Sequence, residues 1–371
     1  MVDLQGQYKG IKEEVDTAVQ DVVSSAFFIN GPAVKAFQSD LESYIGVKHV
    51  IPCANGTDAL QIALMGLKLE PGDEVITADF TFAATVEVIG LLQLIPVLVD
   101  VDPKTFNIDP SAIEKAITPK TKAIIPVHLF GQTAPMDAIL EIAKNHDLYV
   151  VEDNAQGIGA TYTREEGSKV KTGAIGHVSA TSFFPSKNLG AYGDGGAIFT
   201  NDDDLAHFIR GIVNHGMYKR YHHDVIGVNS RLDSIQAAIL KVKLQYLDFY
   251  NERRKEAALR YTAFFEGHPN IITPYREGAC GSHVFHQYTL RIINHDRDAL
   301  VQHLSEMGIP CGVYYPIPLH AQKAYLRPEF KDADFPVTNQ LVKEVISLPM
   351  HSELTVEQIE FIAKSVLDFL K

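Results

Sequence analysis

The sequence predicts an α/β protein whose larger part is built on a mainly parallel β-sheet. Over residues 49–145, short apolar runs of strand length alternate with amphipathic segments of helix length. Alternation of this kind is typical of parallel strands that are joined by crossover helices and covered on both faces. After about residue 251 the pattern becomes less regular and predicts a smaller α/β unit. We therefore place a large domain at residues 1–245 and a small C-terminal domain at residues 246–371.

Two amphipathic helices are expected before the first strand. Apolar residues fall on one face of the segment Tyr8–Ser25, and a second helix is expected to follow Gly31 and Pro32 and to run through Tyr44. These helices would form a layer that covers the rest of the fold.

The repeating unit then runs in order along the chain. We expect strands at residues 49–54, 74–78, 95–101 and 123–127, and helices at residues 59–69, 82–92, 110–117 and 135–145. The next apolar run starts at Leu148 and ends in Glu152 and Asp153. A carboxylate would thus lie at the C-terminal end of a parallel strand, which is where open α/β sheets bind their ligands.

One long helix is expected near the domain boundary. Apolar residues between Leu232 and Phe249 follow a single seam, so we predict a continuous helix over Ser230–Tyr250 that links the two domains. Ser230 and Asp233 have the spacing of a capping box at its start. In the small domain we expect a strand at 283–293 and helices at 296–307 and 356–370.

Two polar stretches are expected to be exposed. Residues 163–172 are rich in charge and predict a hairpin or loop. Residues 215–224 carry three histidines, at positions 215, 222 and 223, but no cysteine partner and no HExxH-type pattern accompanies them. We therefore expect a mobile loop that faces the substrate, and no metal site.

Lys187 is the strongest candidate for a reactive side chain. It lies between an apolar run that ends at Phe184 and a segment that contains four glycines, at positions 190, 193, 195 and 196. A lysine on a turn between buried segments can have a desolvated amine, and desolvation makes the amine nucleophilic. The alternative interpretation is an ordinary loop lysine.

Asp153 and Ser182 give Lys187 a chemical context. Asp153 precedes Lys187 by 34 residues, and Ser182 precedes it by five. Chemistry with pyridoxal 5'-phosphate (PLP) needs these three groups: the lysine holds the aldehyde as a Schiff base, the carboxylate keeps the pyridine nitrogen protonated, and the hydroxyl helps to hold the phosphate.

A second anion site is expected where the first strand meets its helix. The turn around Gly56 and Thr57 follows the strand at residues 49–54 and precedes an apolar-periodic helix. The first N–H groups of a helix are unpaired and the helix dipole favours negative charge, so we assign Gly56 and Thr57 to the cofactor phosphate. A plain strand-to-helix turn is the alternative.

Three motifs carry a family resemblance. The stretches EDNAQ (152–156), SFFPSKNLGAYGDGG (182–196) and GVNSRLDSIQAA (227–238) resemble the signatures of the DegT/DnrJ/EryC1/StrS nucleotide-sugar aminotransferases, and the similarity covers nearly the whole chain. The resemblance implies PLP-dependent transferase fold type I, which is aspartate-aminotransferase-like: a large domain with a mixed, mainly parallel seven-stranded sheet and a smaller C-terminal α/β domain.

The resemblance also implies roles for further residues. Phe82 would stack on the pyridine ring, although a core phenylalanine is the alternative, and Gln156 would hydrogen-bond the ring hydroxyl. Asn229 matches a position that reaches across a subunit interface to the neighbour's PLP phosphate, which implies a homodimer with composite sites. Lys187 would be displaced by the amine of L-glutamate and would then act as base and acid in the proton shift.

The substrate expectation rests on the same likeness. Within the family the chain is most similar to enzymes that aminate C3 of a UDP-linked 2-acetamido-3-keto-glucuronic acid, which act in amino-sugar biosynthesis for surface polysaccharide such as lipopolysaccharide O-antigen. Arg231 would clamp the sugar carboxylate, with a surface ion pair as the alternative, and Tyr315 and His320 would complete the sugar pocket. The rival acceptor is a dTDP-linked 3-keto-6-deoxyhexose, whose methyl group offers Arg231 nothing to bind.

Charge, apolar run lengths and cysteine content argue against a nucleic-acid-binding, membrane-spanning or secreted protein. The net charge is −13, which argues against a nucleic-acid partner. No run of the sequence has the length of a membrane span, and the N-terminal residues lack the apolar core of a signal peptide, so we expect a cytoplasmic protein with no membrane partner. The three widely separated cysteines, at positions 53, 280 and 311, fit reduced thiols.

Three other functions are weighed against aminotransfer. A sugar dehydratase of the same fold carries a histidine in place of the Schiff-base lysine, and Lys187 argues against it. A nicotinamide oxidoreductase would need GxGxxG, whereas the glycines after Lys187 read GxxGxGG. A non-catalytic regulatory protein on this fold is the third alternative, because fold does not dictate function.

Overall fold

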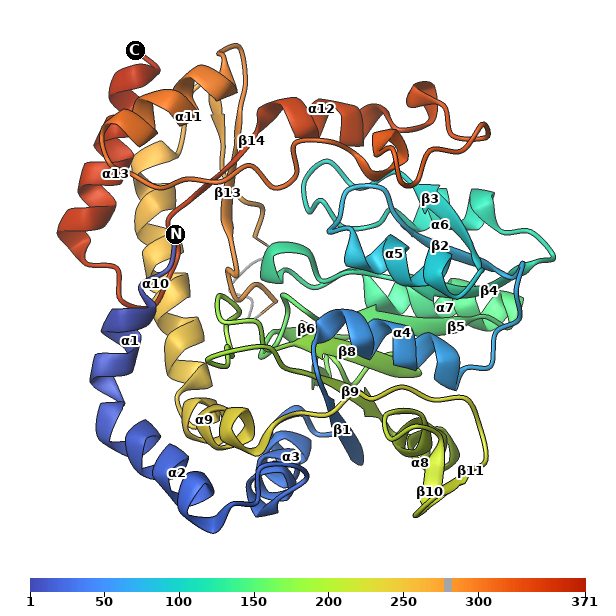
Figure 1. The fold of residues 1–371 in the computed structure, drawn as a ribbon. Coiled ribbons are helices and arrows are strands. Elements are labelled where there is room, and N and C mark those ends of the chain that lie inside the picture. The colour runs from blue at the N-terminus through green and yellow to red at the C-terminus, as the bar shows by residue number, and fades with distance from the viewer. Residues whose placement is uncertain (277–281) are drawn as a thin grey trace.

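The computed structural model describes residues 1–276 and 282–371, and a seven-stranded sheet lies at its centre (Figure 1). The strand order is β1-β9-β8-β5-β4-β2-β3. Strand β9 runs antiparallel to both of its neighbours, β1 and β8, and the other neighbouring strands pair in parallel. The predicted mixed, mainly parallel sheet is confirmed. Its strands are β1 (His49–Cys53), β2 (Glu74–Ala78), β3 (Ile95–Val99), β4 (Thr121–Ile125), β5 (Tyr149–Asp153), β8 (Val178–Ser182) and β9 (Gly196–Thr200).

Helices cover both faces of this sheet because alternate strand residues point to opposite sides. In β4, Ala123 and Ile125 pack in one core with α4, α5 and α8, whereas Ile124 packs in another with α6 and α7. At the β1 and β9 edge, α3 and α9 cover the second face. These helices are α3 (Pro32–Ile45), α4 (Gly56–Gly66), α5 (Ala84–Leu91), α6 (Pro110–Ala116), α7 (Met136–His146), α8 (Asp203–Ile212) and α9 (Ser234–Leu244).

A second, smaller sheet lies beside the large one. Strands β12 (Ile271–Ile272), β13 (Tyr288–Ile292) and β14 (Val345–Leu348) form an antiparallel sheet in the order β12-β13-β14. Helices α10 (Leu247–Phe265), α11 (Arg297–Glu306) and α13 (Val356–Phe369) share its apolar core. Helix α12 (Pro336–Glu344) instead extends across the large sheet, where Leu341 and Val342 join its core (Figure 1). The domain boundary at residue 245 stays a prediction.

The predicted helix Ser230–Tyr250 is wrong in two respects, and the first is that the segment forms two helices. Helix α9 ends at Leu244 and α10 begins at Leu247. Between them, the N–H groups of Gln245 and Tyr246 bond three residues back, to the carbonyls of Val242 and Lys243, so the chain leaves the α-helical pattern there. The start is also later than predicted, because Asp233 is the residue that precedes the first turn of α9.

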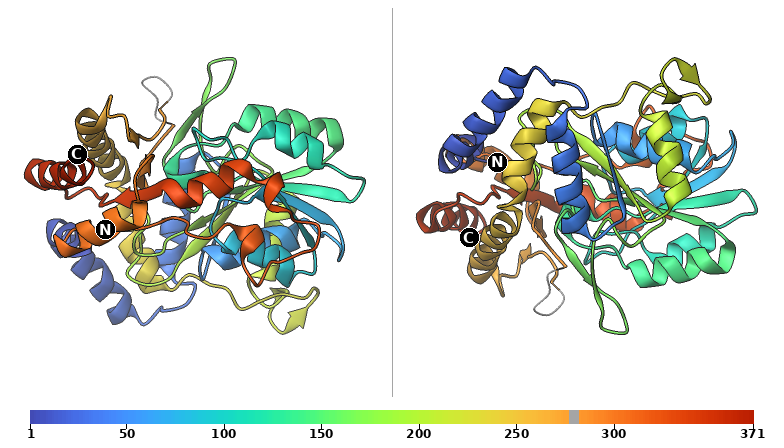
Figure 2. Two further views of the ribbon diagram at one scale, coloured as in Figure 1. Left: turned by 90° about the horizontal axis from the view of Figure 1, so that it is seen from above. Right: turned by 90° about the horizontal axis from the view of Figure 1, so that it is seen from below.

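The remaining α-helices and β-strands are the two N-terminal helices and the strands of two short hairpins. The predicted N-terminal helix is split into α1 (Leu4–Gly10) and α2 (Lys12–Ser25), and α2 packs beside α9 (Figure 2). Residues 163–172 belong to a hairpin of β6 (Thr161–Thr163) and β7 (Lys169–Lys171), and the histidine-rich segment forms a hairpin of β10 (Met217–Lys219) and β11 (His222–His223).

Two predictions from composition can be compared with the structure. Within residues 1–276 and 282–371, no helix combines the length and apolar character that crossing a membrane requires. Cys53 and Cys311 are free thiols, and Cys280 lies outside the described residues.

Candidate active site

A cavity of about 720 Å³ opens where the strands of the large sheet end. Its walls come from the segments that follow β1, β2, β4, β5 and β8, and from two segments beside the small sheet. This is the edge at which open α/β sheets bind ligands. Eight residues that the sequence predicts for the site line this cavity together: Gly56, Thr57, Phe82, Asp153, Gln156, Ser182, Lys187 and Tyr315.

The loop after β8 positions Lys187. Its backbone N–H donates to the Phe184 carbonyl over 2.8 Å, and the Ala191 N–H closes the loop by donating to the Phe183 carbonyl over 2.7 Å. Burial lowers the pKa of the Lys187 amine to about 8, and the Asp153 carboxylate opposes that shift only in part. At pH 7 about a tenth of this lysine is therefore a free amine, far more than for an ordinary lysine of pKa about 10.4, and a nucleophile and proton carrier needs this form.

Asp153 ends β5 and is buried, with 5% of its surface exposed. One carboxylate oxygen accepts from the Thr85 hydroxyl over 2.9 Å, and the other accepts from the Ala155 N–H over 3.1 Å. Burial raises the pKa of Asp153, and these two hydrogen bonds and Lys187 offset the rise only in part. A buried carboxylate with few partners is suited to a cationic nitrogen, because a positive charge beside it would stabilise the ionised form.

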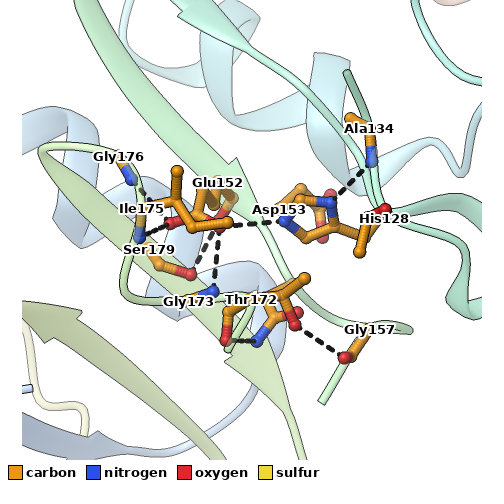
Figure 3. A network of polar contacts seen from close by, with 12 residues as sticks. His128, Ala134, Glu152, Asp153, Gly157, Thr172, Gly173, Ile175, Gly176 and Ser179 are labelled. Carbon is orange, nitrogen blue, oxygen red and sulfur yellow. Dashed lines mark hydrogen bonds and ion pairs between the residues drawn. The ribbon is translucent and has the colours of Figure 1, made fainter. Parts of the chain in front are cut away.

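A polar network behind Asp153 fixes the end of β5 (Figure 3). The adjacent residue, Glu152, points to the opposite face and is fully buried. Its carboxylate accepts from His128 Nε2 over 2.9 Å and from three backbone N–H groups, those of Gly173, Ile175 and Gly176, over 2.7 to 2.8 Å. Burial alone would raise the pKa of Glu152, but these donors outweigh it and hold the pKa below its ordinary value.

His128 also joins this network to the backbone of β5. The backbone N–H of His128 donates to the Asp153 carbonyl over 3.1 Å, and its ring Nδ1 accepts from the Ala134 N–H over 3.0 Å. Neither Glu152 nor His128 was predicted as part of the site. The sequence did hold one signal, because His128 directly follows the predicted strand at residues 123–127, just as Asp153 ends the next one.

The start of α4 forms a narrow cradle with the end of β8. Asn55 caps the helix by accepting from the Asp58 N–H over 2.8 Å. A Cβ atom at Gly56 would lie 2.6 Å from the Ser182 Cβ, so only glycine allows this approach. Helix N–H groups and a serine hydroxyl therefore converge at one end of the cavity, which suits an anionic group such as a phosphate.

Aromatic and amide groups form another part of the cavity wall. Phe82 is 56% exposed and its ring centroid lies 6.2 Å from that of Tyr315. The Tyr315 hydroxyl accepts from Gln156 Nε2 over 3.2 Å, and Gln156 Oε1 accepts from the Phe130 N–H over 2.6 Å. Phe82 is therefore not a core phenylalanine, which was the alternative interpretation. Its stacking on the pyridine ring of the cofactor stays a prediction.

Three predicted residues do not line the cavity in the described part of the chain: Asn229, Arg231 and His320. His320 is buried, and its two ring nitrogens lie 2.7 Å from Asp79 and 2.9 Å from Asp332. Its imidazole is thus engaged by carboxylates, and its predicted contact with the sugar stays a prediction. Asn229 is exposed and Arg231 is half-buried, ahead of α9.

Comparison with known proteins places this site in context. A family model described as the DegT/DnrJ/EryC1/StrS aminotransferase family matches residues 9–367. A pleiotropic regulatory protein of Geobacillus stearothermophilus is 48% identical over 100% of this chain and 98% of its own length. A UDP-2-acetamido-2-deoxy-3-oxo-D-glucuronate aminotransferase of Pseudomonas aeruginosa is 46% identical over 98% of both chains. The crystal structure of a DegT DnrJ EryC1 StrS aminotransferase from Brucella abortus has a TM-score of 0.94 at 40% identity and covers 99% of this chain and 98% of its own.

The residues of the cavity fit the cofactor that these proteins imply. Solved structural neighbours hold PLP or its amine form, and the cofactor of this chain is PLP. PLP chemistry requires a reactive lysine, a carboxylate for the ring nitrogen and an anion site for the phosphate. The cavity supplies a buried amine of lowered pKa, the buried Asp153 carboxylate and the narrow cradle at Gly56.

Proposed function

We propose, from the premise that this chain belongs to the DegT/DnrJ/EryC1/StrS aminotransferase family, that it moves the amino group of L-glutamate to C3 of UDP-2-acetamido-2-deoxy-3-keto-glucuronate. Enzymes of this family are PLP-dependent transaminases. The observation that carries aminotransfer is the meeting of Lys187 and Asp153 in one cavity at the sheet edge. The acceptor rests on the name of the Pseudomonas relative and on Arg231.

Different residues of this chain would have different roles in aminotransfer. PLP, when bound, supplies a ring that accepts electrons from the bond to the amino carbon. Lys187 holds the cofactor and carries protons to and from the substrate carbon, which its pKa of about 8 permits near neutral pH. Asp153 would pair with the ring nitrogen of the bound cofactor, and Gly56, Thr57 and Ser182 would hold its phosphate.

The proposal includes a second copy of the chain. Asn229 and Arg231 precede α9, and the exposed apolar residues Phe27, Phe28 and Ile29 lie next to that turn. The Ser234 N–H donates to the Phe28 carbonyl over 2.9 Å, and Ile29 bridges to Asp233. An apolar cluster of this kind is typical of an interface, so we infer a homodimer in which Asn229 and Arg231 reach the partner's cavity.

Arg231 would then bind the carboxylate of the acidic sugar. A guanidinium binds a carboxylate through two parallel hydrogen bonds, whereas the methyl group of a 6-deoxyhexose offers no such partner. We also infer that the reaction serves amino-sugar biosynthesis for surface polysaccharide in the cytoplasm, an inference that rests on this class of substrate.

The test offers the purified enzyme both keto sugars, generated in situ, with glutamate as donor and mass spectrometry of the products. We expect amination of the UDP-linked uronate, a loss of at least tenfold in kcat/KM for Arg231→Ala, and partial recovery for Arg231→Lys. The reason is that a hydrogen bond to a charged group contributes about 1.5–3 kcal/mol. Turnover of the deoxyhexose alone, or unchanged uronate kinetics in Arg231→Ala, would reject this acceptor and leave aminotransfer intact.

A regulatory role is the competing function, because the Geobacillus relative is named as a regulatory protein. One measurement on the wild-type protein distinguishes the regulatory function from the aminotransferase function. An aminotransferase is yellow as purified and loses that colour when glutamate is added. A protein that PLP cannot colour would favour the regulatory role.

A further inference from the structure

His286 is a buried histidine in the cavity wall that the reaction described above does not use. It lies beside the small sheet, two residues before β13, and it is 6% exposed. Its backbone carbonyl accepts from Arg254 over 3.4 Å, and its Nδ1 lies 3.2 Å from Oδ1 of Asn188, the residue that follows Lys187. Both its main chain and one ring nitrogen are therefore held in place.

The partners of Asn188 decide which ring nitrogen carries the proton. The Asn188 side-chain nitrogen donates to the Val284 carbonyl over 3.1 Å and to Asn251 Oδ1 over 2.7 Å. A carbonyl can only accept, so the amide nitrogen of Asn188 must face Val284 and its oxygen must face His286. The Nδ1 atom of His286 is then the donor, and it carries the hydrogen.

The other ring nitrogen is left as an acceptor. Burial, the nearby Lys187 amine and Arg254 together hold the pKa of His286 well below its ordinary value, so the ring is neutral at physiological pH. With the hydrogen on Nδ1, Nε2 keeps its lone pair. Among the described residues, Nε2 of His286 receives no hydrogen bond, although His286 is one of the residues that line the cavity.

We propose that His286 is a substrate-contacting residue, and that its Nε2 accepts a hydrogen bond from a donor group of a substrate bound beside Lys187. The donor group is a hydroxyl of the keto sugar or the amino group of glutamate, because both substrates enter the cavity in turn. A purely structural role would need only Nδ1, which already satisfies Asn188. The proposal rests on the aminotransferase function and not on which keto sugar is the acceptor.

A matched pair of variants separates the two ring nitrogens. His286→Asn places an amide nitrogen near the position of Nδ1, so it keeps the bond to Asn188 and removes the acceptor. His286→Gln places an amide oxygen near the position of Nε2, so it keeps an acceptor and loses the bond to Asn188. Each half-reaction is followed separately by the absorbance of the cofactor, first with glutamate and then with whichever keto sugar the wild-type enzyme aminates.

We expect His286→Asn to lower the rate constant of one half-reaction at subsaturating substrate by about fivefold, the size of one neutral hydrogen bond. The absorbance of the Lys187-bound cofactor and its pH titration should stay unchanged, and His286→Gln should recover most of the lost rate. A loss confined to the glutamate step assigns the amino group, and a loss confined to the sugar step assigns a hydroxyl.

Two results would overturn the proposal. In one, both half-reactions of His286→Asn keep wild-type values. In the other, both variants shift the pH titration of the bound cofactor and slow both steps alike, as a structural role through Asn188 would require. If His286→Asn fails to fold, His286→Ala takes its place as the variant without an acceptor, and the proposal is overturned unless His286→Ala slows one half-reaction and His286→Gln restores it. Failure of the wild-type enzyme to aminate the uronate would reject the proposed acceptor and would leave the proposal for His286 unaffected.

Discussion

His128 donates a hydrogen bond from Nε2 to the carboxylate of Glu152 over 2.9 Å, and both side chains are fully buried behind Asp153. Because His128 Nδ1 accepts from the Ala134 N–H, the neutral imidazole carries its hydrogen on Nε2. The pair is thus a neutral histidine beside a carboxylate that also receives three backbone N–H groups. It ties the segment after β4 and the segment before β8 to the strand that ends in Asp153.

Glu152→Gln should destabilise the protein strongly. The amide would bring N–H groups toward donors that need an acceptor, and each buried donor left unsatisfied costs about 1–3 kcal/mol. We expect a loss of about 3 kcal/mol in the free energy of unfolding, measured by urea denaturation. Glu13→Gln, on an exposed face of α2, is the matched control and should change stability by less than about 0.5 kcal/mol.

The pH dependence of stability should report on the same carboxylate. The folded-state pKa of Glu152 is lowered, so its contribution is fully present above the unfolded pKa of about 4.3 and is lost as the pH falls through the folded value. The stability difference between wild type and Glu152→Gln should therefore shrink only below about pH 4. A difference that stays constant down to pH 3 would contradict the assigned charge state.

Lys187 should react with amine-directed reagents at an unusually low pH. In the apoenzyme its amine becomes unprotonated as the pH rises through about 8, whereas an ordinary lysine requires about 10.4. Mass spectrometry of the labelled peptide across pH 6–11 gives the midpoint. Asp153→Asn removes a negative charge that favours the ammonium form, so its midpoint should be lower. An ordinary midpoint in both proteins would show that the amine is not desolvated.

Local patterns in the sequence were sufficient to predict a mainly parallel sheet and the placement of Asp153 and Lys187 at its edge, whereas the count of seven strands came from the family resemblance. Asp153 ends an apolar run and Lys187 follows another, so each lies at a strand end that the fold brings to one edge. The break between α9 and α10 was missed because the apolar seam continues through Tyr246 to Phe249, and side-chain periodicity does not report a change in backbone hydrogen bonding. The role of His286 depends on Asn188, which lies 98 residues away in the chain, so no local pattern indicates it.

Gly56→Ala should weaken cofactor binding. The added Cβ would lie 2.6 Å from the Ser182 Cβ, so the start of α4 and the end of β8 must move apart at the proposed phosphate site. Overpacking of this kind costs about 1–3 kcal/mol, which corresponds to a rise in the PLP dissociation constant of about 5- to 150-fold. Spectroscopic titration of the apoenzyme with PLP measures this dissociation constant. Gly90→Ala in α5, where a Cβ meets nothing within 4 Å, should leave the constant unchanged.

Asn229 should act in the cavity of the partner subunit. Within the described residues of one chain it does not line the cavity, yet its exposed position beside Phe27, Phe28 and Ile29 suits contact with a second copy. Lys187→Ala alone should abolish turnover and the attachment of PLP that borohydride makes permanent, because no other lysine lines the cavity in the described part of the chain. Asn229→Ala alone should retain Lys187 but bind the cofactor phosphate poorly.

Mixing these two inactive proteins tests the composite site. After subunit exchange, a heterodimer has one site with Lys187 from one chain and Asn229 from the other, and a second site that lacks both. With random exchange half of the dimers are heterodimers, so activity should recover to about a quarter of the wild-type value. Mixing Lys187→Ala with the double variant Lys187→Ala/Asn229→Ala is the control and should recover nothing. A wild-type enzyme that sediments as a fully active monomer would exclude the shared site, because Asn229 would then have no partner cavity to reach.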